Sequence, residues 1–132
     1  MSIILVTHNL GIVSELADRV AVMYAGSIVE TASVSDLRNH PMHPYSVALI
    51  DAVPSLGGAR KHLNTIRGSV PSPEQFNRGC RFYGRCSFAD QFSSEEQKIC
   101  NEEKPCPVEI TPGHYCACHY VKPENIANAG KN

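Results

Sequence analysis

Six cysteines all lie between residues 80 and 118 of this 132-residue chain. The segment around them is rich in turn residues and shows little apolar periodicity. At about 40 residues it is also too small to build a sufficient hydrophobic core without a disulfide, a metal or a cluster. Because the chain has no secretory signal, metal or cluster ligation is a better interpretation than a disulfide framework. Disulfides or simply buried thiols are the alternative. The cysteines are Cys80, Cys86, Cys100, Cys106, Cys116 and Cys118.

The overall composition is that of an ordinary globular domain, with 42% hydrophobic and 19% charged residues. A net charge of −1 lacks the basic surplus that nucleic-acid binding usually requires, which disfavours a zinc-ribbon nucleic-acid binder. The longest fully apolar stretch, Val20–Ala25, is far shorter than the ~20 residues of a bilayer-spanning helix. We therefore expect an intracellular, soluble chain that reaches a membrane only through partners.

The N-terminal third predicts an α/β fold. Ile3–Val6 is a continuous apolar run, which is typical of a strand buried on both faces of a parallel sheet. Asn9 suits the N-cap of a helix over residues 10–18. Two β-prone runs, at 20–24 and 27–30, are separated by two residues that include a glycine, and this pattern predicts a tight hairpin.

Two His-Pro steps follow the predicted hairpin. Ser33 and Asp36 have the spacing of a capping box, which would begin a short helix that Pro41 must end. Pro44 suits the first position of the next helix. Each proline pushes the histidine before it toward extended geometry, so the run His40-Pro41-Met42-His43-Pro44-Tyr45 predicts a rigid turn between helices. A metal site built from the two histidines is the alternative.

The N-terminal segments Ile4–Leu10, Ala17–Met23 and Ala25–Glu30 together resemble the end of an ABC ATPase core. The resemblance implies that His8, where the strand gives way to the helix, is the switch histidine. In that family this residue senses the γ-phosphate and helps to hold the attacking water. Asn9 stands where the family often has Asp.

The His-Pro-x-His-Pro-Tyr run resembles the motif that marks ATP-binding subunits of oligopeptide, dipeptide and nickel importers. Ile66-x-Gly68-x-Val70-Pro71-x-Pro73 and Gly79-Cys80 continue the pattern, so the resemblance covers roughly residues 3–120. It implies the end of an ATPase core followed by short helices and a loop-rich, Cys-containing C-terminal module. A complete subunit would bind ATP and Mg, pair with a second ATPase subunit and contact membrane subunits at the cytoplasmic face of the cell membrane.

The motifs that hydrolyse ATP are absent from this sequence. A phosphate-binding loop requires Gly-x4-Gly-Lys-Ser/Thr, and the only Gly-Lys pair, Gly130-Lys131, lacks the first glycine and the final hydroxyl. None of residues 1–7 is acidic, so no Walker B strand precedes His8. We therefore expect an inactive C-terminal part of a subunit that energises peptide import. The alternative is a non-enzymatic metal- or iron–sulfur-binding module for regulation or docking.

The same resemblance implies four cysteine ligands for a [4Fe–4S] cluster, with zinc as the alternative. The family usually places the third ligand where this chain has Ser93. The residues after Cys100 fit the downstream context of that ligand, so we assign Cys100 and keep Cys106 as the substitute. Cys116 is expected to be a neighbour of the site. The expected ligands are Cys80, Cys86, Cys100 and Cys118.

Three arginines flank the first two of these thiols, namely Arg78, Arg81 and Arg85. Positive charge at these positions is expected to lower the pKa of the thiols and to offset the charge of a cluster.

The patterns divide the chain into five expected segments. Because the strand at residues 3–6 would have open edges in this chain, self-association is also expected. The segments are the end of the ATPase core (1–32), a helical extension (33–54), a connector (55–79), the Cys-rich metal or cluster module (80–120) and a flexible tail (121–132).

Overall fold

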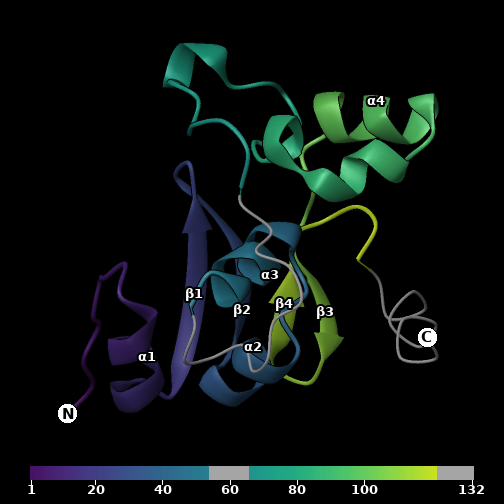
Figure 1. Cartoon of the computed structure of the whole chain (residues 1–132). Coiled ribbons are helices and arrows are strands. Elements are labelled where there is room, and N and C mark those ends of the chain that lie inside the picture. The colour runs from purple at the N-terminus through teal and green to yellow at the C-terminus, as the bar shows by residue number, and fades with distance from the viewer. Residues whose placement is uncertain (54–65, 122–132) are drawn as a thin grey trace.

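The computed structural model describes residues 1–53 and 66–121, which form a mixed α/β structure around one small antiparallel sheet (Figure 1). The sheet has four strands in the order β1-β2-β4-β3. It joins a hairpin from the beginning of the chain to a second hairpin from the end. The strands are β1 (Arg19–Tyr24), β2 (Ser27–Ser33), β3 (Val108–Thr111) and β4 (His114–Cys116).

The predicted tight hairpin between β1 and β2 is confirmed. Ala25 and Gly26 both have positive φ, at 48° and 79°. Two such residues form the type I′ turn, whose twist matches that of the flanking strands. Strand β2 continues beyond its predicted end at residue 30, because Ser33 still pairs with Arg19 of β1.

Three of the four α-helices begin where the sequence predicts. The Asn9 side chain accepts hydrogen bonds from the backbone amides that follow it, and Ser33 caps the next helix in the same way. Pro44 takes the first helical position of the third helix. Among the described residues, no helix is long and apolar enough to cross a bilayer. The helices are α1 (Leu10–Leu16), α2 (Val34–Asn39), α3 (Pro44–Asp51) and α4 (Ser94–Glu102).

Helix α4 was not predicted from the sequence. Ser93 and Glu96 form a capping box at its start, and this Ser-x-x-Glu spacing is the signal that could have revealed it. Three short 3-10 helices also interrupt the region expected to be irregular. They span Pro73–Gln75, Tyr83–Arg85 and Ser87–Gln91.

The strand expected at Ile3–Val6 is wrong for this chain. The segment has no regular secondary structure, and its side chains are exposed, with Ile4 at 94% and Val6 at 92%. A strand needs a neighbour to pair its backbone N–H and C=O groups. No described segment of the chain pairs with these residues, so the apolar run lies uncovered at the N-terminal end of the structure (Figure 1).

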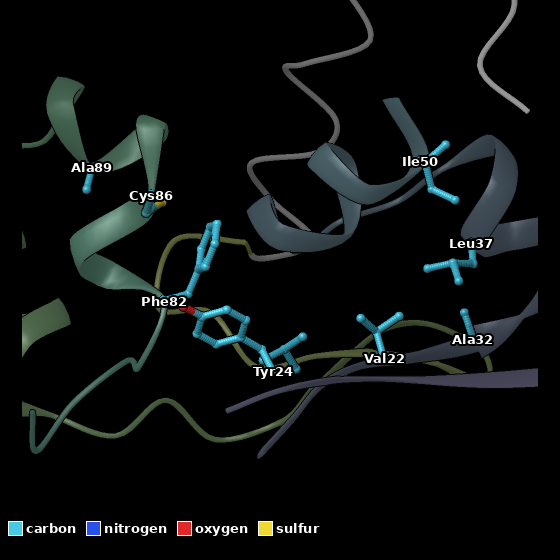
Figure 2. Close-up of a cluster of buried hydrophobic side chains, with 9 residues drawn as sticks. Val22, Tyr24, Ala32, Leu37, Ile50, Phe82, Cys86 and Ala89 are labelled. Carbon is cyan, nitrogen blue, oxygen red and sulfur yellow. The ribbon is translucent and has the colours of Figure 1, made fainter. Parts of the chain in front are cut away.

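The core connects the first hairpin to the Cys-rich segment. Figure 2 shows Phe82 and Tyr24 side by side, and their ring centroids lie 5.1 Å apart in an edge-to-face arrangement. Tyr45 of α3 packs against the same Phe82 ring, with 5.4 Å between the two ring centroids. Such aromatic pairs add about 0.5–1.5 kcal/mol beyond the area they bury. The loop that begins at Cys80 is therefore held directly against β1 and α3.

The division of the chain into five segments stays a prediction, although β4 pairs directly with β2. The last residue of the expected helical extension, Pro54, lies outside the described residues. So do the first part of the connector and residues 122–132 of the tail, including Gly130-Lys131.

Candidate metal centre

Four cysteines that are far apart in the sequence line one small cavity of about 20 Å³. They come from the loop before the second 3-10 helix, from its end, from α4 and from the segment after β4. His43 and His119 line the same cavity. The cysteines are Cys80, Cys86, Cys100 and Cys118, which are the four that the sequence singled out.

A close approach of two backbone segments places Cys80 beside Cys100. The Cys80 amide donates to the Cys100 carbonyl at 2.7 Å, and the Gly79 amide donates to the Asn101 carbonyl at 3.1 Å. A Cβ atom on residue 79 would lie 2.2 Å from the Cys100 carbonyl oxygen, so only glycine fits there. The Gly79-Cys80 pair therefore docks onto the end of α4 and brings two thiols to the cavity.

Three of the four cysteine thiols interact with two backbone amides each. Burial raises the pKa of the Cys80 thiol to about 11, and the backbone amides of Phe82 and Tyr83 oppose that rise. Burial likewise raises the pKa of Cys86 and Cys118, again against two backbone amides, those two and three residues further along. Amides directed at sulfur favour the thiolate, which is the form that binds a metal.

The fourth cysteine, Cys100, lacks this support and depends on its neighbours. Burial, followed by the charges of Cys118, Cys80 and Cys86 in that order, raises its pKa to about 12. Because each thiolate disfavours the others, a set of four thiolates in this cavity requires a positive centre among them.

The arginines do not have the expected effect on the thiols. Arg81 donates to the Ala25 carbonyl and stacks on Phe76, with 4.3 Å between its guanidinium carbon and the ring centroid. Arg85 donates to Tyr24 and to loop carbonyls, and Arg78 is exposed. The expectation of lowered thiol pKa values is therefore wrong, because burial dominates at every cavity cysteine.

The two remaining cysteines do not line the cavity. Cys106 is exposed, and Cys116 is buried in β4, where burial and the nearby Glu30 raise its pKa. Ser93 accepts a hydrogen bond from the Glu96 amide as the N-cap of α4. The choice of Cys100 as the third ligand stays a prediction, and the cavity geometry supports it over Cys106.

The carboxyl group of Glu30 is buried and is hydrogen-bonded to the backbone of His43, which lines the cavity. Glu30 is 1% exposed, and its two oxygens accept hydrogen bonds from the backbone amides of Met42 and His43, each at 2.9 Å. His114 Nε2 lies 2.6 Å from Oε1 of the same carboxylate and is equally buried. Glu30 therefore ties β2 to the His-Pro turn and to β4. Sequence reasoning missed this pair because the two side chains are 84 positions apart.

His43 contributes a further polar group next to the thiols. Its Nδ1 accepts a hydrogen bond from the Tyr45 amide at 3.0 Å, which caps α3. Its Nε2 is buried without a hydrogen-bond partner among the described residues. Burial lowers the pKa of His43 to about 4, so the ring is neutral near pH 7. The other cavity histidine, His119, lies with Nε2 2.6 Å from the Glu103 carbonyl.

The nucleotide-sensing residue predicted from the sequence lies in a different part of the chain. His8 is exposed immediately before Asn9, the N-cap of α1. Its assignment as a switch histidine stays a prediction.

Residues 29–91 match the family model for the C-terminal region of oligopeptide/dipeptide transporters. The chain is 53% identical over 85 residues to the oligopeptide transport ATP-binding protein AppD of Bacillus subtilis, a match that covers 64% of this chain and 26% of the relative. It is 46% identical over 99 residues to a putative peptide import ATP-binding protein of Brucella melitensis, with coverage of 75% and 30%. It is 44% identical over 90 residues to the oligopeptide transport ATP-binding protein OppD of Haemophilus influenzae, with coverage of 68% and 28%.

These relatives are named as ATP-binding proteins of oligopeptide transport or peptide import. Residues 29–91 of the chain belong to the C-terminal region of the oligopeptide/dipeptide transporter family. The matched part spans between a quarter and a third of the length of these curated relatives.

The Glu30–His114 pair gives a direct prediction about stability. His114→Ala removes the side-chain hydrogen-bond partner of the buried Glu30 carboxyl group, so the free energy of unfolding should fall by about 1–3 kcal/mol. His40→Ala is the matched control, because His40 belongs to the same chain but is exposed, and it should change stability by less than about 0.5 kcal/mol. Urea denaturation followed by circular dichroism measures both. Equal, small effects of the two substitutions would contradict the role given to Glu30.

Proposed function

We propose that this chain is the C-terminal part of an ATP-binding subunit that energises peptide import, and that its four cavity cysteines hold an iron–sulfur cluster. The family match supports the first statement. The single observation that carries the second is the gathering of Cys80, Cys86, Cys100 and Cys118 around one cavity.

The complete subunit would bind ATP and Mg, pair with a second ATPase subunit and contact the membrane subunits at the cytoplasmic face of the membrane. The relatives are named as ATP-binding proteins of peptide transport, which supports this assignment. In that setting His8 would sense the γ-phosphate. The uncovered apolar run Ile3–Val6 supports the expectation that the chain self-associates when it is taken alone.

The choice of a cluster over zinc rests on the family resemblance. Four thiolates are the usual ligands of a [4Fe–4S] cluster, and closed structural zinc sites also use four thiolates. Within residues 1–53 and 66–121, no group of three or more His, Cys, Asp or Glu side chains has the arrangement of a bound metal site. The resemblance implies a [4Fe–4S] cluster at these cysteines, with zinc as the alternative.

The residues around the cavity have clear roles toward such a centre. The backbone amides that follow Cys80, Cys86 and Cys118 would stabilise the thiolates, and a bound cluster would supply the positive iron that offsets their mutual repulsion. The aromatic ring of Phe92 and the other apolar lining would limit the access of water. The centre would link the loop at Cys80 to α4 and to the segment after β4, so we assign it a structural role in the C-terminal module.

Single Cys→Ser variants test the ligand set. After anaerobic reconstitution with ferrous iron and sulfide, loss of any cavity cysteine should strongly reduce the iron and sulfide bound per chain, because each supplies one ligand. Loss of a cysteine outside the cavity should leave the content near that of the unchanged chain. The ligand variants are C80S, C86S, C100S and C118S, and the controls are C106S and C116S.

The ligand assignment has two distinct ways to fail. If C106S or C116S strips the iron while C100S retains it, the third ligand is wrong. If no single variant changes the content, the cysteines do not form a metal site in this chain.

The absence of a phosphate-binding loop gives a prediction about activity. The chain alone should release no phosphate above background from saturating Mg-ATP, because its sequence has neither a Walker A loop nor an acidic Walker B strand. A steady-state phosphate assay on the purified chain is the measurement, with His8→Ala as the control for a contaminating ATPase. Activity that persists through purification and disappears in the His8→Ala variant would contradict the proposal.

A further inference from the structure

We propose that the Nε2–H group of His43 donates a hydrogen bond to a sulfur atom of the centre held in the cysteine cavity, and thereby raises the reduction potential of that centre. The inference rests on the proposed iron–sulfur function. It gives the second histidine of the His-Pro-x-His-Pro-Tyr motif a role beyond the turn in which it lies.

The hydrogen bond at Nδ1 fixes which nitrogen of His43 carries the proton. The Tyr45 backbone amide is a donor, so Nδ1 must present its lone pair. In a neutral imidazole the proton then belongs to Nε2. A doubly protonated ring has no lone pair at Nδ1, so the same hydrogen bond requires a neutral ring. His43, which lines the cavity, is therefore a donor at Nε2.

The Nε2–H group lacks an acceptor within the described protein. Its nitrogen is buried, and no described residue accepts its hydrogen. A buried donor without an acceptor destabilises the folded state, so a native structure usually supplies a partner. The cavity that His43 lines is otherwise formed mainly by aromatic and apolar groups and by four cysteine sulfurs. A thiolate or sulfide in that cavity would supply the missing acceptor.

The same tautomer argues against His43 as a metal ligand. A ligating nitrogen must offer a lone pair, and the lone pair of the neutral ring is already engaged by Tyr45. Ligation through Nε2 would require removal of its proton and an anionic ring. Donation to sulfur requires no change of protonation.

The position of the donor is set by the buried carboxylate. Glu30 Oε2 accepts a hydrogen bond from the His43 backbone amide at 2.9 Å, and Glu30 is only 1% exposed. Pro44 follows at the first position of α3 and restricts the backbone there. His40, the first histidine of the motif, is exposed and does not line the cavity. The two histidines therefore differ in their surroundings, and this difference provides a control.

Two substitutions of His43 separate its two hydrogen bonds. In His43→Asn the short amide can still accept from the Tyr45 amide as an N-cap, but the distal donor is lost. In His43→Gln the amide nitrogen reaches about as far as Nε2, so the donor is retained while the cap is weakened. His40→Asn is the matched control in the exposed half of the motif.

The readout is the reduction potential of the full chain after anaerobic reconstitution with ferrous iron and sulfide, measured by a redox titration with optical detection. A donor to sulfur stabilises the more negative, reduced centre. His43→Asn should therefore shift the potential to a lower value, while His43→Gln and His40→Asn should remain near the unchanged chain.

Several results would overturn the inference. An intact centre whose potential is the same in the unchanged chain and in His43→Asn would refute the donor role alone. Equal shifts in His43→Asn and His43→Gln would assign the effect to packing. If His43→Asn no longer shifts the reduction potential once His119 has been replaced by Phe, the acceptor is the ring of His119 and not a sulfur atom. If the unchanged chain takes up no iron and sulfide, the proposed centre itself is refuted, and the donor role fails with it.

Discussion

The buried carboxylate of Glu30 is the interaction on which the arrangement of the site depends. A charge removed from water is tolerated only where hydrogen bonds and an opposite charge compensate it. Here the compensating groups are two backbone amides of the His-Pro turn and the ring of His114. Strands β2 and β4 and the turn before α3 must therefore come together, as Figure 1 shows for the two strands. The segment from Cys116 to Cys118 and the ring of His43 take their places from this contact.

The local elements were predictable because their signals lie within a few residues of one another. The hairpin turn at Ala25-Gly26 and the caps at Asn9 and Ser33 depend only on neighbouring backbone groups. The strand expected at Ile3–Val6 is absent, because a strand forms only where another segment pairs with it and no described segment pairs with these residues.

The site was predictable in part. Resemblance to the family singled out four cysteines, and the structure places all four around one cavity. The assignment of Cys100 over Cys106 gains support from the contact at Gly79, which lies in a distant part of the sequence. The role of His43 as a hydrogen-bond donor could not be predicted, because it depends on the burial of Nε2 and on the hydrogen bond that Nδ1 accepts from Tyr45. The effect of the arginines was mispredicted because their partners are carbonyl groups that only the fold brings near.

We propose that the cysteine cavity holds an iron–sulfur centre. The most direct test of this proposal is quantification of iron, acid-labile sulfide and zinc in the unchanged chain after anaerobic purification, together with its visible absorption spectrum. The account predicts iron and sulfide in equal amounts and a broad visible band. A colourless chain that holds one zinc ion, or no metal at all, would contradict it.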